Sequence, residues 1–255
     1  MRLLVKIGGS LLDSPEARTA LAGGVAAIRK GGAELVLVHG GGKQMTRFLA
    51  GRGIESRFVR GLRVTTPEIA DAVLKVFTGT VNPQLVSALV AAGLDAVGLS
   101  GIDAALVEAE QLDPELGAVG RPVRVNARLL EVLAQSGYLP VVACVAGDRA
   151  GRVYNVNADQ MASACAAAFR AARLIFLTDV DGVRGGDGAV IPRLTAAAAE
   201  QLIATGVASG GMEAKLRAAL AALDGGGEVS IAPGAAPDVL KRLLDGEPLG
   251  TRLVQ

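Results

Sequence analysis

The chain has 255 residues, enough for one large α/β domain or two small ones, with a substantial buried core. The 26 Lys and Arg residues nearly balance the 25 Asp and Glu residues, and aromatic residues make up only 3 %, so neither charge nor stacking surfaces indicate nucleic-acid binding. Hydrophobic residues make up 51 %, yet no apolar run reaches the roughly 20 residues of a membrane span, and no secretory signal pattern is found. We therefore expect no membrane partner.

Several chemistries are excluded by what the sequence lacks. His39 is the only histidine, so a histidine-based zinc site is absent, and no G-x-S-x-G motif supports serine-hydrolase chemistry. Neither a Walker A loop nor a G-x-G-x-x-G fingerprint occurs. Cys144 and Cys165 lie in apolar surroundings without a C-x-x-C pair, which predicts reduced core cysteines and a cytoplasmic protein.

The first two predicted strands each end in glycines. The run Leu3–Ile7 precedes Gly8 and Gly9, and the run Leu35–Val38 precedes His39 and the three glycines Gly40–Gly42. A strand that passes through glycines into a helix leaves main-chain N–H groups facing outward, which favours anion binding. A plain turn needs fewer glycines than three, so the second loop in particular predicts close approach of a ligand.

Lys6 lies inside the first predicted strand, directly before the first glycine loop. A charged side chain in an apolar strand is costly unless it is paired or faces a site. It is either an edge lysine that reaches solvent or a positive charge placed for a phosphate.

The rest of the chain alternates β-branched apolar runs with Ala- and Leu-rich helical stretches, which predicts βαβ units around a mostly parallel sheet. Helix starts are predicted where a capping side chain precedes proline, at Ser14-Pro15, Thr66-Pro67 and Asn82-Pro83. A β-hairpin excursion is predicted over Ala105–Val125. The remaining predicted strands are Ala96–Leu99, Leu139–Val145, Leu174–Thr178 and Glu228–Ile231.

Two segments in the first two thirds of the chain carry candidate binding residues. Arg63 stands among apolar neighbours in Gly61–Thr65, where it is either a solvated arginine or a clamp for a carboxylate. Asn155 and Asn157 are spaced to face one side of an extended segment before the helix Gln160–Phe169. Asp159 at that helix start is either a cap or a functional carboxylate.

Two segments in the last third of the chain also carry candidate binding residues. Thr178–Val183 ends a strand with two carboxylates and a glycine, which is either a turn or a contact for a nucleotide or its Mg²⁺ water shell. Lys215 lies in the first turns of the helix opened by Gly210, where the helix dipole disfavours a lysine unless a phosphate is bound nearby. Because ligands bind beyond the carboxyl ends of parallel strands, we expect these loops and the glycine loops to converge at one rim of the sheet.

Taken together, these segments resemble the amino-acid kinase family, and within it the members that act on N-acetyl-L-glutamate. The resemblance extends in order over nearly the whole chain, from Val5–Ser10 and Val38–Lys43 through Gly61–Thr65 and Asn155–Asp159 to Gly211–Lys215 and Leu249–Leu253. It implies a three-layer αβα sandwich with a central, mostly parallel sheet. It also implies an acyl-acceptor lobe over residues 1–172 and an ATP-binding lobe over residues 173–255.

The resemblance further implies that MgATP phosphorylates the side-chain carboxylate of N-acetyl-L-glutamate in arginine biosynthesis. Lys6 and Lys215 would neutralise the phosphoryl group in transfer, and Asp159 would hold both lysines. Gly41, Gly42, Arg63 and Asn155 would bind the acceptor. The residues implied to contact the nucleotide are Gly8, Gly9, Asp179, Val180, Asp181, Gly182, Val183, Arg184, Val207, Ala208 and Ser209. No residue is expected to bind a metal other than the one that the nucleotide carries.

Alternatives within and outside this chemistry stay open. The same phosphoryl transfer could act on an aminoadipate derivative, a carrier-linked amino acid, glutamate or aspartate. A silent member that only senses an amino acid or nucleotide would be marked by loss of Lys6, Asp159 or Lys215, and all three are present. The chain begins at its first strand, as do the arginine-insensitive dimeric members of the family, so we expect a homodimer.

Overall fold

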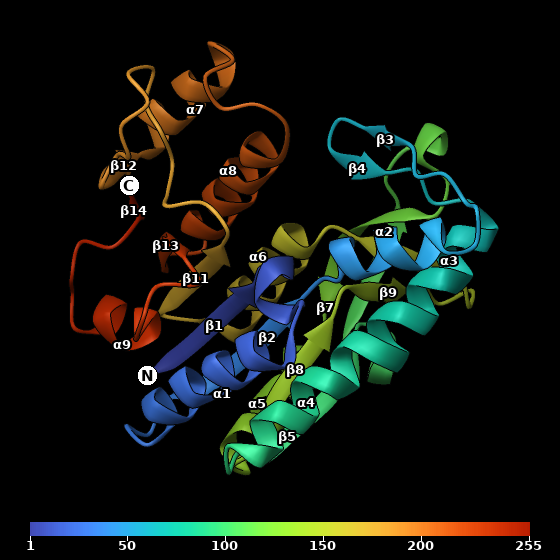
Figure 1. Ribbon diagram of the computed structural model, residues 1–255, viewed down its shortest axis with the longest axis horizontal. Helices are drawn as coiled ribbons and strands as arrows, with labels where there is room; N and C mark the ends of the chain where they lie inside the picture. Colours follow the sequence, from blue (N-terminus) through green and yellow to red (C-terminus); the bar gives the residue numbers. More distant parts are fainter.

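The computed structural model describes residues 1–255 as three layers, a central sheet between two layers of helices (Figure 1). All strands of the sheet run parallel except β14, which pairs antiparallel with β13, and its edge neighbour β12. The predicted α/β class and mostly parallel sheet are confirmed. In order across the sheet, the strands are β12 (Arg193–Thr195), β14 (Thr251–Val254), β13 (Glu228–Pro233), β11 (Arg173–Thr178), β1 (Arg2–Ile7), β2 (Glu34–His39), β8 (Leu139–Ala143) and β5 (Ala96–Ser100).

Helices cover both faces of this sheet. One layer holds α1 (Pro15–Arg29), α2 (Gly42–Ala50), α3 (Pro67–Val73), α4 (Asn82–Ala91) and α9 (Val239–Leu244), with α1 and α4 side by side. The other holds α5 (Ala127–Gln135), α6 (Ala158–Phe169) and α8 (Gly210–Leu223), with α7 (Ala196–Ala204) beside α8 and β12. Short 3₁₀ turns are η1 (Gly9–Leu12), η3 (Asp103–Ala105) and η4 (Pro114–Leu116).

The helix starts expected from the sequence are confirmed in two of three places. The Ser14 hydroxyl accepts a hydrogen bond from Ala17 N (3.2 Å) and the Thr66 hydroxyl accepts one from Ile69 N (3.3 Å), so both residues cap their helices. The prediction at Asn82-Pro83 is wrong, because α3 continues into α4 through the π-helical turn η2 (Leu74–Val81). The wider π turn admits a proline ring that would clash with the preceding turn of a regular α-helix.

The continuous helix Pro67–Ala91 has 25 residues and is long and apolar enough to cross a membrane by length and composition. One side of it is buried in the core, however, through residues such as Phe77, Leu85 and Leu89. Core helices of α/β folds pass the same length and composition test, so this helix supports no membrane assignment.

The predicted hairpin over Ala105–Val125 is confirmed, with β6 (Val107–Gln111) antiparallel to β7 (Val119–Val125). The two strands close into a small barrel with β9 (Val145–Gly147) and β10 (Val153–Val156). The run Leu139–Val145 was predicted as one strand, but it divides at Cys144, because β8 stays in the main sheet while β9 joins the barrel. The barrel thereby brings β10 and the start of α6 to the carboxyl ends of β1 and β2.

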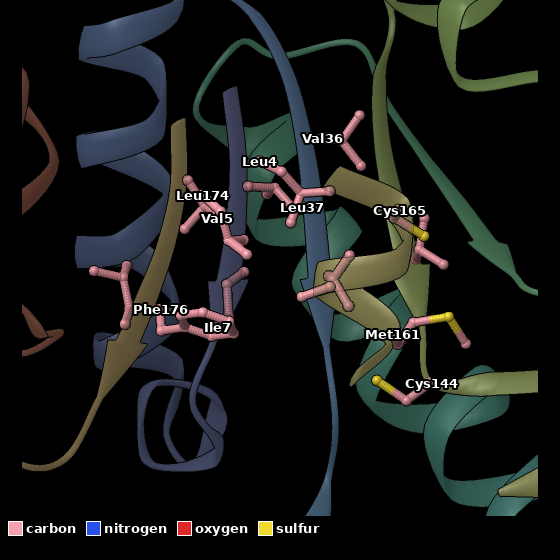
Figure 2. Close-up of a cluster of buried hydrophobic side chains, with 14 of the residues drawn as sticks. Leu4, Val5, Ile7, Val36, Leu37, Cys144, Met161, Cys165, Leu174 and Phe176 are labelled. Atoms are coloured by element: carbon pink, nitrogen blue, oxygen red, sulfur yellow. The ribbon is translucent and has the colours of Figure 1, made fainter. Parts of the chain in front are cut away.

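A single cluster of 65 buried residues forms the core and includes strands on both sides of residue 172. Figure 2 shows part of it, with Met161 and Cys165 of α6 over the sheet and Leu4, Val5, Leu37 and Phe176 on the strands. Cys144 and Cys165 are free and buried, as predicted. The division into an acceptor lobe and a nucleotide lobe at residue 172 stays a prediction.

Candidate active site

The carboxyl ends of β1, β2 and β11 meet at one rim of the sheet, where two lysines share one carboxylate. Lys6 Nζ lies 2.9 Å from Asp159 Oδ1, and Lys215 Nζ lies 2.9 Å from Asp159 Oδ2. The three side chains are 9 to 11 % exposed. Lys6, Asp159 and Lys215 thus form one buried ionic cluster with a net positive charge, although Asp159 and Lys215 are 56 positions apart in the chain.

Each member of the Lys6–Asp159–Lys215 cluster stands on a different element. Lys6 is on β1, between Phe176 of β11 and Val38 of β2 in the sheet register. Lys215 is in the second turn of α8, and its ammonium lies 5.5 Å from the centre of the Phe176 ring, within cation–π range. Asp159 is in the first turn of α6. The rigid sheet and two packed helices therefore hold the cluster in place.

The Asp159 carboxylate is free for the lysines because another side chain caps α6. Asn157 Oδ1 accepts hydrogen bonds from the main-chain N–H groups of Asp159 (2.9 Å) and Gln160 (3.1 Å). The sequence left open whether Asp159 was a cap, and the cap is Asn157 instead. Both oxygens of Asp159 point to ammonium groups.

The cluster holds two ammonium groups and only one carboxylate, and the pKa values of Asp159 and Lys215 are both lowered. Burial alone would raise the pKa of Asp159, but Lys6 and Lys215 outweigh burial and hold the pKa of this carboxyl below its usual value. Burial and the nearby Lys6 ammonium lower the pKa of Lys215, against the opposing effect of Asp159. Two ammonium groups against one carboxylate leave an uncompensated positive charge in a poorly solvated place, which an entering anion would neutralise.

Both glycine loops lead from the sheet into helical turns beside this cluster. Gly8 precedes η1, and a Cβ on Gly8 would lie 2.8 Å from the Leu177 carbonyl oxygen. Gly41 precedes α2, and a Cβ on Gly41 would lie 2.8 Å from the Phe77 ring. Only glycine lets the main chain pass so close to its neighbours here, and the first N–H groups of each turn stay open to a ligand.

His39 is fully buried and takes no part in proton transfer. Burial lowers the pKa of its imidazole to about 4, in spite of the opposing effect of the Gly40 carbonyl. The ring is therefore neutral at neutral pH, and both of its nitrogens contact protein groups. These contacts hold the His39 ring in place between the glycine loop and Asn82.

A model of the amino acid kinase family matches residues 1–232. The chain belongs to this family. It is similar to the acetylglutamate kinase of Solibacter usitatus, with 64 % identity over 255 residues that cover 100 % of this chain and 99 % of that protein. The acetylglutamate kinase of Acidobacterium capsulatum is 46 % identical over 246 residues, 95 % of each chain.

Several solved structures share the fold. N-acetylglutamate synthase from Neisseria gonorrhoeae, complexed with coenzyme A and N-acetyl-glutamate, superposes with a TM-score of 0.88 at 26 % identity. That match covers all of this chain but only 59 % of the synthase, so the present chain spans less than two thirds of it. Giardia carbamate kinase, with a TM-score of 0.75 at 16 % identity, shows the fold alone. The three-layer sandwich predicted from the amino-acid kinase resemblance is confirmed.

Arg63 ends the hairpin formed by β3 (Phe58–Val59) and β4 (Leu62–Arg63). Its guanidinium donates to Thr46 Oγ1 (2.8 Å), to the Gly42 carbonyl oxygen (3.3 Å) and to the Ser56 hydroxyl, and it lies 4.7 Å from the centre of the Phe58 ring. Burial lowers its pKa, and no carboxylate forms an ion pair with it. The Arg63 charge is therefore held at the start of α2 without a protein counter-ion.

Asn155 lies on β10, close to the same hairpin. Its Nδ2 donates to the buried Thr65 hydroxyl (3.0 Å), which in turn donates to the Arg63 carbonyl oxygen (2.9 Å). The sequence did not single out Thr65 by itself, yet this hydroxyl links Asn155 to the Arg63 segment. Asn155 and Arg63, two of the four residues predicted to bind the acceptor, are thereby connected through the side chain of Thr65.

The segments expected to contact the nucleotide are more open. Asp181 and Arg184 form an exposed ion pair (3.0 Å), and Val180 and Val207 are exposed apolar side chains, 37 % and 44 % respectively. Val183 and Ala208 are buried, so only their main chain can face a ligand. Val183 N donates to Thr251 Oγ1 (2.8 Å), which ties this loop to β14.

The hairpin and α8 approach each other closely at two glycines. A Cβ on Gly61 would lie 3.7 Å from the Gly210 carbonyl carbon, and Gly61 has a φ of 76°. A cavity of about 620 Å³ lies between this hairpin tip, α6 and α8, and none of the three cluster residues lines it. The hairpin that carries Arg63 therefore lies across this cavity from the helix that carries Lys215.

The residues at the rim suit a polyphosphate better than a protein-bound metal. No group of three or more His, Cys, Asp and Glu side chains could hold a metal ion, and both Asp159 oxygens are taken by lysines. The excess positive charge and the open N–H groups of the glycine loops instead match phosphate oxygens.

Proposed function

We propose that this protein transfers the γ-phosphoryl group of MgATP to the side-chain carboxylate of N-acetyl-L-glutamate. The product would be N-acetyl-L-glutamyl 5-phosphate, an acyl phosphate of arginine biosynthesis. The observation that carries the proposal is the buried cluster in which Lys6 and Lys215 share Asp159 beside two glycine loops. The similarity to acetylglutamate kinases over the whole chain supports the choice of acceptor.

The reaction requires no general base. A carboxylate is ionised at neutral pH and attacks the γ-phosphorus directly, while the bond from phosphorus to the bridging oxygen breaks and ADP leaves with the electron pair. The work left for the protein is to align the two substrates and to compensate negative charge. A site with a single, neutral histidine is sufficient for this chemistry.

Each cluster residue has a distinct role in this proposal. Lys6 and Lys215 would stabilise the oxygens of the phosphoryl group in transfer, and Asp159 would hold the two ammonium groups at a fixed separation. Their mutual repulsion within a buried site would be relieved when the anionic group arrives, which favours the transition state.

The acceptor would be held by groups of the first half of the chain and by Asn155. Arg63 lacks a protein counter-ion and would pair with the α-carboxylate. Asn155 would bind the acetylamino portion, and the N–H groups of Gly41 and Gly42 would bind the reacting carboxylate or the phosphoryl oxygens. A free α-amine would call for a neighbouring carboxylate, so an N-acylated acid fits this set better.

The nucleotide would lie against the last third of the chain, over Gly8 and Gly9. The exposed side chains of Val180 and Val207 could cover an apolar ring, and the loop from Asp179 to Arg184 could contact the ribose and phosphates. Ser209 stands directly before α8, whose N-terminus would add positive potential. Mg²⁺ would arrive with the nucleotide, since both Asp159 oxygens are engaged by lysines.

Acyl phosphate formation, trapped as the hydroxamate, tests the proposal. N-acetyl-L-glutamate is compared with glutamate, aspartate and N-acetyl-aminoadipate at equal MgATP. Turnover confined to N-acetyl-L-glutamate is expected. Turnover on another acid would keep the kinase chemistry and overturn the acceptor, and nucleotide binding without turnover on any acid would favour a carrier-linked substrate or a silent sensor. The expected homodimer and cytoplasmic location belong to the same proposal, and light scattering of the purified protein tests the dimer.

A further inference from the structure

His39 joins β2 to the Gly40–Gly42 loop and is the only histidine in the chain. Its ring is fully buried, with Nδ1 2.8 Å from the Gly40 carbonyl oxygen and Nε2 2.9 Å from Asn82 Nδ2. A neutral imidazole carries one N–H, so one of these contacts has the ring as donor and the other has it as acceptor. The identity of the donor nitrogen follows from the partners.

Both partners of the ring require the same tautomer. The Gly40 carbonyl oxygen can only accept a hydrogen bond, so the neighbouring Nδ1 must carry the ring proton. On the other side of the ring, Asn82 Nδ2 also lies 2.9 Å from the Val141 carbonyl oxygen on β8, which likewise can only accept. The amide group of Asn82 must therefore face both Val141 and His39 with its N–H bonds, and His39 Nε2 must accept. The ring proton is then on Nδ1, where it donates to Gly40 O.

This donation sets the orientation of the next peptide group. The carbonyl of Gly40 and the N–H of Gly41 belong to one peptide plane, and in a trans peptide they point in opposite directions. A Gly40 carbonyl bonded to the buried His39 ring therefore turns the Gly41 N–H away from the core. That N–H makes no hydrogen bond within the chain.

The neighbourhood of Asn82 is built around this contact. A Cβ on Gly98 would lie 2.1 Å from Asn82 Oδ1, so glycine at position 98 is what lets the amide lie over β5 and β8. The π-helical turn η2 before Asn82 places Phe77 against Gly41 on the other side of the loop. The same helix thus holds the loop by packing and by a hydrogen-bonded relay.

We propose that Asn82 is a positioning residue for phosphoryl transfer, which acts through the Nδ1–H tautomer of His39 and the Gly40 carbonyl to aim the Gly41 N–H at the substrates. The inference rests on the proposed function for its kinetic consequence. The tautomer and the direction of the Gly41 N–H follow from the structure and can be tested without a substrate.

The first test is a ¹⁵N NMR spectrum of the imidazole in the whole protein at neutral pH. The single histidine gives one pair of ring nitrogens, so the assignment is unambiguous. A protonated Nδ1 and a bare Nε2 that accepts a hydrogen bond are expected. In Asn82→Leu, which has similar volume but no amide, Nε2 loses its donor, so its ¹⁵N resonance should shift. A protonated Nε2 in the wild type would overturn the relay, whatever the acceptor of the enzyme is.

The second test compares kcat in two Asn→Leu variants that each lose side-chain amide hydrogen bonds. Asn82→Leu should lower kcat by about 10- to 100-fold, since a small misplacement of binding groups is sufficient for such a loss. Asn126→Leu loses a side-chain hydrogen bond to the Ala104 carbonyl (3.0 Å), which involves none of the candidate site residues, and it should stay within about twofold of wild type. Binding of ADP by calorimetry should be unchanged in both. Equal kcat values in the two variants would refute the positioning role.

Two substitutions of His39 separate its hydrogen bond to Gly40 O from its packing in the core. The side-chain amide of His39→Asn can still donate toward Gly40 O, whereas His39→Leu cannot. Urea titration first establishes that both variants are folded. His39→Asn should then retain a higher kcat than His39→Leu. The reverse order would overturn the proposal. If the wild type proves inactive on every acid tested, the proposed function fails while the NMR result still decides the relay.

Discussion

The two sides of the candidate active site are built differently. On the proposed acceptor side, Arg63 is itself buried and hydrogen-bonded, and Asn155 and the Gly40 carbonyl are hydrogen-bonded to the buried side chains of Thr65 and His39. On the nucleotide side, the Asp181–Arg184 pair is exposed and the side chains of Val180 and Val207 face solvent. The difference indicates that the acceptor side is ordered in advance, whereas the nucleotide side gains its contacts when the ligand binds.

The Lys6–Asp159–Lys215 cluster stands between the two sides, so its loss should have the largest effect. Lys215→Met keeps most of the side-chain volume and removes the ammonium. We expect kcat to fall by about 10²- to 10³-fold, the range for loss of one preorganised charge-stabilising group. The measurement is steady-state hydroxamate formation.

The control for this variant is Lys241→Met on α9, where the exposed lysine pairs with Asp245 one turn away. It should keep wild-type turnover. If Lys215→Met also had the kcat of the wild type, the cluster would not be the phosphoryl-stabilising site. The cluster would then not separate an acceptor side from a nucleotide side.

Acid should weaken the prearranged acceptor side through His39. Burial lowers the pKa of His39 from 6.5 to about 4, so the unfolded chain binds a proton that the folded chain does not. Stability is then complete above the unfolded pKa and falls as pH decreases from 6.5 towards 4, by up to about 3 kcal/mol because one pKa unit corresponds to about 1.4 kcal/mol.

Urea titrations at several pH values check this expectation. His39→Asn cannot titrate and serves as the matched variant, since the carboxylates contribute to both proteins alike. The wild type should lose more stability than His39→Asn over this pH range. Parallel pH profiles would mean that the imidazole is not buried in neutral form.

Replacement of Arg63 tests whether its guanidinium binds the acceptor. Arg63→Ala should raise KM for the acceptor by about 10- to 100-fold, because a hydrogen-bonded charge pair contributes about 1.5–3 kcal/mol. KM for MgATP should change little. Arg57→Ala, which removes an exposed arginine of the same region that pairs with Glu115 (2.9 Å), is the comparison. A larger effect of Arg63→Ala on MgATP than on the acceptor would place Arg63 on the nucleotide side instead.

The smallest effect is expected on the nucleotide side. Asp181→Asn breaks an exposed pair worth at most about 1 kcal/mol, so KM for MgATP should change by no more than about fivefold. A change of a hundredfold would show that this loop is ordered for its ligand to the same degree as the acceptor side, which would remove the contrast between the two.

Local signals predicted much of the fold and part of the site. The capping residues Ser14 and Thr66 and the glycines that follow β1 and β2 depend on nearby backbone geometry, which short patterns encode well. The signal at Asn82-Pro83 misled because it is the same as that of a helix start. Only the tertiary neighbours of Asn82, on β2 and β8, reveal a buried amide in a continuous helix.

Short sequence patterns could not predict which distant residues pair in the structure. The resemblance implied that Asp159 holds two lysines, but the residues between Asp159 and Lys215 give no local indication of a 2.9 Å contact. Asn157 and Asp159 are both good capping residues, and which of them caps α6 depended on the lysines that occupy the other. Such choices are made by packing and charge in the assembled sheet rather than by propensity.

The contact between the hairpin and α8 bears on turnover. Gly61 and Gly210 face each other without side chains, so at this point no side chain would have to be re-ordered if the two elements moved together. Closure at such a point would cost little side-chain entropy. An acyl phosphate is hydrolysed readily by water, and a closure that is quick to form and quick to part would shield the product during its formation and still let it depart promptly to the next enzyme.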